Sequence, residues 1–111
     1  MNKKYEVIWS EVAENDLTAI LDYITAESPG NALKVFKQIK QKAASLNFFP
    51  ERGRIVPELG DLRILQYREL ILSPWRFIYR ISETRVYLLS VLDSRQDIDE
   101  ILFKRLIDAR I

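Results

Sequence analysis

The chain has 111 residues, of which 48% are apolar and 30% are charged, and its formal net charge is +1. This length predicts one domain with a single modest core, spanning residues 1–111. There is no cysteine and no histidine, which excludes disulfides, thiolate metal sites and the commonest general base. No segment approaches the ~18 continuous apolar residues of a membrane span. We therefore expect a cytoplasmic protein with no metal, no cofactor and no membrane contact.

The first half of the chain predicts a strand followed by two helices. Residues 5–9 are rich in β-forming side chains and precede Ser10, a good helix N-cap. Apolar residues then recur at helical spacing on both sides of a break at residues 28–31, where Asn31 is expected to cap the second helix. The first stripe is Ala13, Leu17, Ile20, Leu21 and Ile24, and the second is Ala32, Phe36, Ile39, Ala43 and Leu46. The short connection predicts an antiparallel helical hairpin.

The segment from Tyr67 to Asp97 predicts three short strands, with tight turns at Ser73-Pro74 and at residues 82–84. Its middle strand alternates strictly, which places unlike side chains on the two faces. One face carries Trp75, Phe77, Tyr79 and Ile81, and the other carries Arg76, Ile78 and Arg80. A three-stranded meander with one aromatic face needs a cover. The helical hairpin is the natural candidate.

Two further segments complete the predicted order of elements. Residues 50–60 are punctuated by Pro and Gly and predict a loop anchored by its apolar side chains. Asp97 and Glu100 form a D-x-x-E capping pattern ahead of a last helix. The order is β-α-α-β-β-β-α, an α+β fold with a helical hairpin packed on a mostly antiparallel sheet.

Basic residues change type along the chain. Lysines alone occur before Pro50, whereas the stretch from Arg52 to Arg95 has eight arginines and no lysine. Strands that tolerate arginine would explain this distribution. A surface that faces oxyanions or phosphates would explain it equally well, because guanidinium groups bind them bidentately. Composition leaves both readings open.

Four stretches together resemble the RelE/ParE family of bacterial toxins. They are VPELG at residues 56–60, YREL at 67–70, WRFIYRI at 75–81 and VLDSRQD at 91–97. The likeness spans nearly the whole chain, with elements in the same order. It implies a toxin of a type II toxin–antitoxin system, held inactive by a cognate antitoxin. RelE-like members cleave mRNA on the ribosome, whereas ParE-like members poison DNA gyrase.

The nuclease alternative can be tested against the RelE-like pattern, which has a lysine-rich strand, two arginines and a C-terminal tyrosine. Arg76 and Arg95 match the two arginines. Arg68 stands where a lysine would be, and a guanidinium that is always charged is a poor general base. Leu70 occupies the next outward position, and Ile101 stands where the tyrosine is expected. If the chain were a nuclease, its catalytic set would be Arg68, Arg76 and Arg95, without acid or base.

Other residues offer weak substitutes or structural readings. Glu69 could serve as a base if burial raised its pKa, but pairing with an arginine across the sheet explains it better. Tyr67 is expected to pack at a strand edge. The arginines have a structural reading too, because Arg76 and Arg80 could pair with carboxylates such as Glu58, Glu69 or Asp93. Arg95 could form a local ion pair with Asp93 or Asp97.

These departures favour the ParE-like branch, in which binding to DNA gyrase replaces catalysis. An enzymatic activity is therefore not expected, although the ribosome with its mRNA is the alternative target. The candidates for an exposed, target-binding basic set are Arg68, Arg76 and Arg95. A non-toxic binding module with the same fold is a third reading.

For the antitoxin, the hairpin supplies apolar residues outside its main stripes: Val12, Tyr23, Leu33 and Val35. These could line a groove for an amphipathic helix of the antitoxin, or the antitoxin could add a strand to the sheet edge. A hetero-oligomer of toxin and antitoxin would follow. Partly exposed apolar residues are also common without a partner, so the sequence leaves this open.

Overall fold

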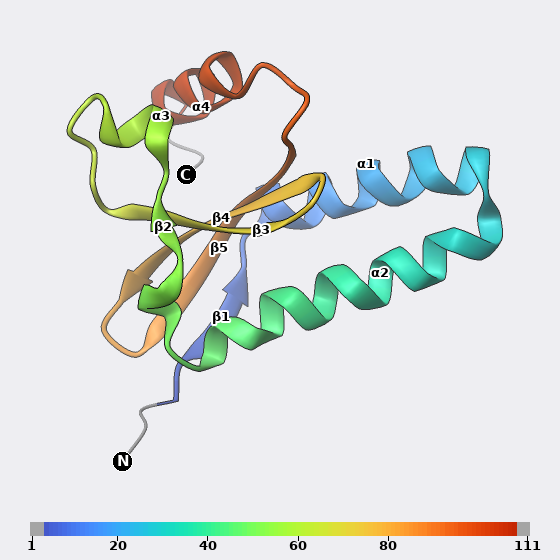
Figure 1. Cartoon of the computed structure of the whole chain (residues 1–111), viewed down its shortest axis with the longest axis horizontal. Helices are drawn as coiled ribbons and strands as arrows, with labels where there is room; N and C mark the ends of the chain where they lie inside the picture. Colours follow the sequence, from blue (N-terminus) through green and yellow to red (C-terminus); the bar gives the residue numbers. More distant parts are fainter. Residues whose placement is uncertain (1–3, 109–111) are drawn as a thin grey trace.

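The computed structural model describes residues 4–108 and confirms the predicted elements and their order, with four short additions (Figure 1). Five strands and four α-helices follow the chain as β1 (Glu6–Trp9), α1 (Glu11–Glu27), α2 (Pro29–Ala44), β2 (Arg54–Ile55), α3 (Pro57–Gly60), β3 (Tyr67–Leu72), β4 (Trp75–Ser82), β5 (Arg85–Asp93) and α4 (Ile98–Ile107). Within residues 4–108, no helix is long and apolar enough to cross a membrane.

The strands form one sheet in the order β1-β5-β4-β3-β2. β1 runs parallel to β5, and the other neighbours are antiparallel, so the predicted mostly antiparallel sheet is confirmed. The additions are β2 and α3, which lie in the segment predicted as a loop, and two short 3-10 helices, Ser45–Asn47 and Pro50–Arg52. A two-residue strand and a single helical turn are too short to show a hydrophobic period, which is why the sequence pattern missed both.

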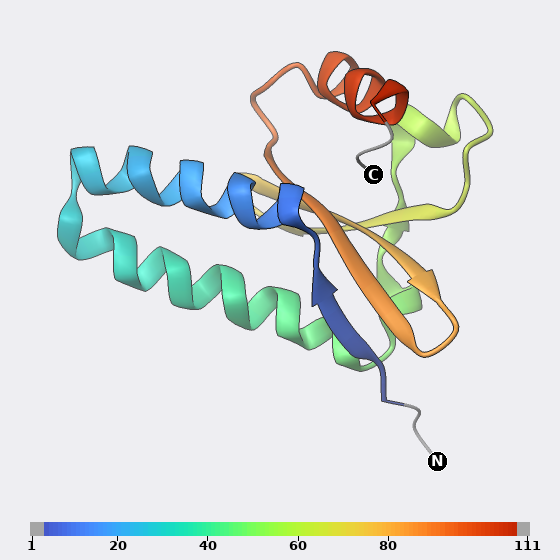
Figure 2. The same ribbon diagram turned by 180° about the vertical axis from the view of Figure 1, so that it is seen from behind.

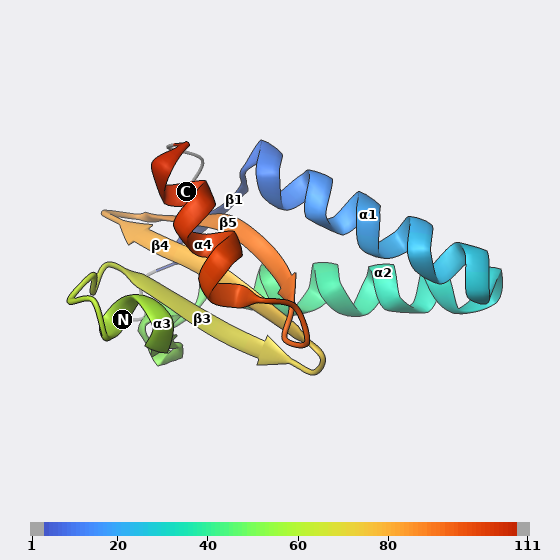
Figure 3. The same ribbon diagram turned by 90° about the horizontal axis from the view of Figure 1, so that it is seen from above.

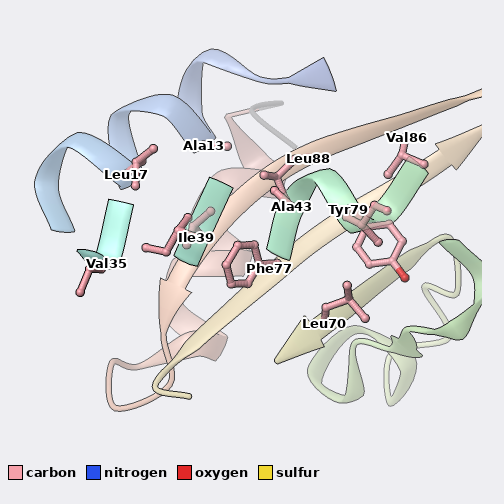
Figure 4. Close-up of a cluster of buried hydrophobic side chains, with 12 residues drawn as sticks. Ala13, Leu17, Val35, Ile39, Ala43, Leu70, Phe77, Tyr79, Val86 and Leu88 are labelled. Carbon is pink, nitrogen blue, oxygen red and sulfur yellow. The ribbon is translucent and has the colours of Figure 1, made fainter. Parts of the chain in front are cut away.

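The α1–α2 hairpin covers one face of the sheet, as predicted (Figure 4). Phe77 and Tyr79 of β4 lie fully buried among the apolar stripes of both helices, with Ile39 at the centre of α2. Ser10 caps α1 as expected, since its hydroxyl accepts a hydrogen bond from the amide of Ala13 at 3.0 Å. The outer half of the hairpin projects beyond the sheet (Figures 2 and 3).

The start of α2 differs from the prediction. Asn31 does not cap the helix, because α2 already begins at Pro29, after Ser28. Proline is favoured at the first helical position, where its fixed φ suits the helix and its missing N–H would have had no intrahelical partner. The predicted cap therefore lies inside the first turn.

The opposite face of the sheet is covered by α3 and α4, which build a second, smaller core. Ile78 of β4 packs there with Val56, Leu59, Ile98 and Leu102, all of them buried. Tyr67, the first residue of β3, also belongs to this core and is buried. The face expected to carry exposed arginines is therefore largely closed.

Helix α1 is attached to β5 beside a β-bulge in that strand. Ser90 pairs with Ile78 and Leu88 pairs with Tyr79, so Leu89 is an extra residue in the ladder. The carbonyl of Leu89 accepts a hydrogen bond from the Ser10 hydroxyl at 3.1 Å. The amide of Val91 donates to the Asp16 carboxylate at 2.9 Å. Both bonds fasten α1 to β5 close to the helix start.

Candidate functional site

Arg76 is the most constrained of the predicted site residues. Its Nε donates to Glu69 Oε1 at 2.6 Å, and its two terminal nitrogens donate to Glu58 at 2.8 and 2.6 Å. Only 8% of the side chain is exposed. Each of its three nitrogens thus already serves a carboxylate oxygen. The prediction that Arg76 belongs to an exposed basic set is wrong, and its structural reading, pairing with Glu58 and Glu69, is confirmed.

The carboxylates around Arg76 extend this contact into a network. Glu69 has a fully buried side chain and also accepts a 2.6 Å hydrogen bond from Nε of Arg54 on β2. The Arg76 hydrogen bond lowers the pKa of Glu58, and the same pairing raises the pKa of Arg76. Both groups therefore stay charged at neutral pH. The network ties β2, α3, β3 and β4 together.

Arg68 lies on the other face of the sheet. It pairs in register with Tyr79, and antiparallel partners share a face, whereas Arg76 lies beside the second core. Its guanidinium donates to the backbone carbonyls of Gly53 at 2.8 Å and Glu51 at 3.2 Å. Leu70, which was predicted to point outward, faces the hairpin and joins the main core. Arg68 and Arg76 thus do not converge on one site.

Arg95 is the most exposed member of the predicted set. Its side chain is 74% exposed and forms a bidentate ion pair with Asp93 at 2.6 and 2.9 Å. The hydrogen bond from Arg95 lowers the pKa of Asp93. Asp97 does not join this pair, because its carboxylate caps α4 by accepting from the amide of Glu100 at 3.1 Å. The guanidinium of Arg80, in contrast, lies 5.2 Å from the centre of the Tyr87 ring.

A cleft of about 660 Å³ lies between α1, the end of β5 and α4. Its walls are mainly apolar, with Ile20, Ile24, Trp75 and Ile101 among them, and Tyr23 and Arg95 lie on its lining. The cleft therefore brings together one residue proposed for the antitoxin and one proposed for the target. Arrangements of this kind, apolar walls with a few charged groups, suit a bound side chain or helix.

A second ion pair at the cleft was not predicted. Arg105 of α4 donates to both carboxylate oxygens of Asp16 on α1, at 2.9 and 2.8 Å, and to the hydroxyl of Ser90 at 2.7 Å. The two partners are 89 positions apart in the chain. Nothing in the local sequence around either residue signals the pairing, because it arises only when α1 and α4 pack near the same end of β5.

Comparison with known proteins now settles the family. The family described as "ParE toxin of type II toxin-antitoxin system, parDE" matches residues 7–98. The chain belongs to this ParE toxin family. A curated relative, "Toxin RelE2" of Caulobacter vibrioides, is 36% identical over 86 residues, which cover 78% of this chain and 91% of the relative.

Solved structures share the fold of this ParE-family chain. One, from a chromosomal ParDE toxin–antitoxin system of P. aeruginosa, has a TM-score of 0.67 at 23% identity. The match covers 81% of this chain and 96% of that one. Another, from the RelBE2 toxin–antitoxin complex of Mycobacterium tuberculosis, has a TM-score of 0.54 at 21% identity, covering 82% and 92%. Both confirm helices packed on a five-stranded sheet.

The four residues predicted for antitoxin binding occupy different environments in the ParE-family fold. Tyr23 is 70% exposed and Leu33 is 60% exposed, and Val12 is half-buried. Val35 is only 6% exposed and packs in the main core. The prediction that Val35 lies outside the apolar stripe is therefore wrong. Val35 lies on the buried face of α2 together with Ile39. Of the four predicted residues, Val12, Tyr23 and Leu33 therefore remain available to a partner.

Proposed function

We propose that this chain is a ParE-like toxin that acts in the cytoplasm by binding DNA gyrase and is neutralised by a cognate antitoxin. The observation that supports this best is the state of Arg76. A nuclease would need this arginine to stabilise the charge that develops on the scissile phosphate. Here all three of its nitrogens donate to the carboxylates of Glu58 and Glu69, and only 8% of its side chain is exposed, so its charge is balanced inside the fold rather than presented to a substrate.

The positions of the other nuclease candidates support binding rather than catalysis. Arg68 lies on the hairpin face of the sheet, away from Arg76, and Arg95 is paired with Asp93. General acid–base catalysis requires groups within hydrogen-bond reach of one reacting centre. The three arginines do not meet around such a centre. We therefore propose Arg68 and Arg95 as contacts to the target and assign Arg76 to the support of the fold.

For the antitoxin, we propose the cleft between α1 and α4 together with the projecting half of the hairpin. Tyr23 connects the two regions, because it lines the cleft and is also highly exposed. Leu33 and Val12 add apolar surface on the same hairpin. An amphipathic helix of the antitoxin would bury this surface. The structural neighbours from toxin–antitoxin systems support such a hetero-oligomer.

A ribosome-dependent mRNA endonuclease is the second candidate. It is favoured by the curated relative at 36% identity, which bears the name "Toxin RelE2". The two functions make opposite predictions for purified components. We expect the full chain to inhibit DNA supercoiling by gyrase and to accumulate cleaved DNA, with no mRNA cleavage in a translation extract. Cleavage of mRNA with unaffected gyrase would establish the second candidate instead, and no effect in either assay would favour a non-toxic module.

Arg95 permits a sharp test of the proposed target contact. Arg95→Ala is expected to weaken gyrase inhibition at least tenfold while leaving the melting temperature unchanged, because the side chain is exposed. Arg85→Ala is the matched control, since Arg85 is exposed at the start of β5, whereas Arg95 lies in the turn after the end of that strand. Equal inhibition by both variants and the wild type would remove Arg95 from the target surface.

A further inference from the structure

The two helices of the hairpin carry opposite charges. α1 contains five acidic residues and no basic residue: Glu11, Glu14, Asp16, Asp22 and Glu27. α2 contains four lysines and no acidic residue: Lys34, Lys37, Lys40 and Lys42. Neighbouring antiparallel helices of opposite charge could have neutralised each other. Among the ion pairs of residues 4–108, however, none joins α1 to α2.

The lysines of α2 are therefore left facing solvent. Lys34 and Lys37 are exposed, and Lys42 is half-buried. Lys40 is set apart from them, because its ammonium group lies 4.4 Å from the centre of the Trp9 ring. Lys34, Gln38, Lys42 and Ser45 follow one another at spacings of four, four and three residues, which places them on one side of the helix.

A second cleft, of about 400 Å³, lies at the C-terminal end of this side of α2. It is lined by Gln38, Gln41, Lys42, Ser45, Arg52 and Leu72, whose hydrocarbon parts make up most of its surface and whose polar ends supply the rest. Among residues 4–108, no carboxylate lines it. Arginine, lysine, glutamine and serine are the side chains that proteins commonly use to contact phosphate and sugar oxygens in nucleic acids.

Arg52 and Arg68 extend the positive charge beyond the helix. Arg52 donates to the backbone carbonyls of Ser45, Phe48 and Phe49 and to the Ser45 hydroxyl. Arg68 donates to the carbonyls of Glu51 and Gly53, on either side of Arg52. Neutral carbonyls hold a guanidinium in place without cancelling its charge. In contrast, Arg54, Arg76, Arg95 and Arg105 all pair with carboxylates.

We propose that Lys34, Lys37, Lys42, Arg52 and Arg68 form a surface, the α2 basic surface, that binds the phosphodiester backbone of duplex DNA. The charge complementarity comes from five cations that form no ion pair with a carboxylate within the described part of the chain, and from the amide and hydroxyl groups between them. The arginines are already fixed by the backbone, so binding costs little of their side-chain entropy. This surface is separate from the cleft that contains Tyr23 and Arg95.

Duplex DNA fits these residues better than the other anionic polymers. Recognition of single-stranded RNA relies on exposed aromatic side chains that stack on bases. Among residues 4–108 none lines the second cleft, although Phe48 and Phe49, whose carbonyls Arg52 binds, are exposed beside it. The lysines and glutamines of α2 match the sequence-independent contacts that proteins make to the phosphates of duplex DNA. The choice of DNA rests on the proposed function, because gyrase holds duplex DNA and a bound toxin could touch both.

Fluorescence anisotropy with the full chain and a labelled 20-base-pair DNA duplex tests the proposal. We expect binding at 50 mM salt, with log K falling by up to about 4.5 per decade of salt, because each neutralised phosphate contributes about 0.9. The variant Lys34→Gln/Lys37→Gln/Lys42→Gln should bind at least tenfold more weakly and lower that slope. The control Arg63→Gln/Arg85→Gln/Lys104→Gln removes the same charge from exposed residues outside this surface and should stay within about threefold of the wild type. Melting temperatures establish that all variants are folded.

Four outcomes would overturn the proposal: no binding at 50 mM salt, an equal loss in the control, tighter binding to an RNA duplex, or equally tight binding to polyglutamate. Gyrase assays on the same proteins separate this proposal from the proposed function. If the chain inhibits supercoiling but does not bind DNA, the proposal of a DNA-binding surface is wrong and gyrase remains the proposed target. If the α2 basic surface binds DNA but supercoiling is unaffected, the DNA-binding proposal holds and the proposal that gyrase is the target is wrong.

Discussion

The two faces of the sheet are stabilised by different kinds of interaction. Under the hairpin, Phe77 and Ile39 belong to a continuous apolar core, in which burial of hydrocarbon provides the stability. On the opposite face, a smaller core around Ile78 lies beside buried charges. There Arg76 and Glu69 are removed from water and depend on each other's hydrogen bonds. Apolar packing tolerates gradual change, whereas a buried ion network fails when one member is lost.

The same contrast separates the arginines by role. Those bound to carboxylates, such as Arg76 and Arg54, have their charge cancelled within the fold. Those bound to carbonyls, Arg52 and Arg68, keep their charge available to a partner. Arg95 is also bound to a carboxylate, but its side chain is 74% exposed. The acceptor and the exposure of the side chain together are thus a better guide to function than the arginine's place in the sequence.

The largest effect is expected in the hairpin core. Phe77→Ala should lower the free energy of unfolding by about 3–5 kcal/mol, because it removes a fully buried ring and leaves a cavity. Urea denaturation followed by circular dichroism measures it. Phe77→Leu is the control and should cost clearly less. A loss below about 1 kcal/mol for the alanine variant would mean that this face does not carry the main core.

On the other face, Arg76→Ala should cost about 3 kcal/mol, because Glu69 would keep a buried charge with only Arg54 as partner. Arg80→Ala, on the same strand but without a carboxylate partner in the structure, should cost well under half as much. The same urea denaturation compares the two. If Arg76→Ala is as mild as Arg80→Ala, the buried network does not stabilise the fold, and any loss of toxicity must come from the target surface.

The segment before β2 packs closely on β3 and β4 at a glycine, Gly53. Gly53 lies so close to β3 and β4 that an added Cβ would stand 2.0 Å from the Tyr79 hydroxyl and 2.7 Å from the Glu69 carbonyl oxygen. Gly53→Ala should therefore cost about 1–3 kcal/mol through overpacking. Thermal unfolding measures the loss. Gly30→Ala has open space around its added Cβ and should be neutral or stabilising; a similar loss at both positions would contradict the steric explanation.

Acid should weaken the charged face selectively. The pKa of Glu58 is lowered in the folded state, chiefly by the hydrogen bond from Arg76, so the fold gains stability above the carboxyl's ordinary value of 4.5. This contribution is lost as the pH falls through the lowered pKa. Glu58→Gln should be less stable than the wild type at pH 7, and the difference should be smaller at pH 2.5. Urea denaturation at both pH values checks this, and an undiminished gap at low pH would contradict it.

The smallest effect on stability is expected at Arg95. Its ion pair with Asp93 is exposed and screened by solvent, so Arg95→Ala should melt within about 2 °C of the wild type. A calorimetric scan measures this. A larger shift would show that the ion pair holds the turn before α4. In that case, a loss of gyrase inhibition by the variant would not identify a direct contact.

The sequence by itself determined the periodic elements and the family. The stripe through Leu17 and the alternation through Phe77 are local patterns whose spacing must match a helix or a strand if apolar groups are to be buried. They predicted which face of β4 the hairpin covers. The family likeness followed from the same stretches, because residues 67–70, 75–81 and 91–97 lie within the match to the ParE toxin family.

Only the tertiary structure decided the roles of the charged residues. Arg76 and Arg95 have the same chemistry in the sequence, yet one is locked between Glu58 and Glu69 and the other lies at the surface. The partners of Arg105 and Arg76 lie 89 and 18 positions away and are brought near by strand register and helix packing. Ion pairs form between groups that are a few ångströms apart in space. The separation of two charged residues along the sequence does not show whether they come that close. Whether an arginine supports the fold or faces a partner is therefore decided by folding.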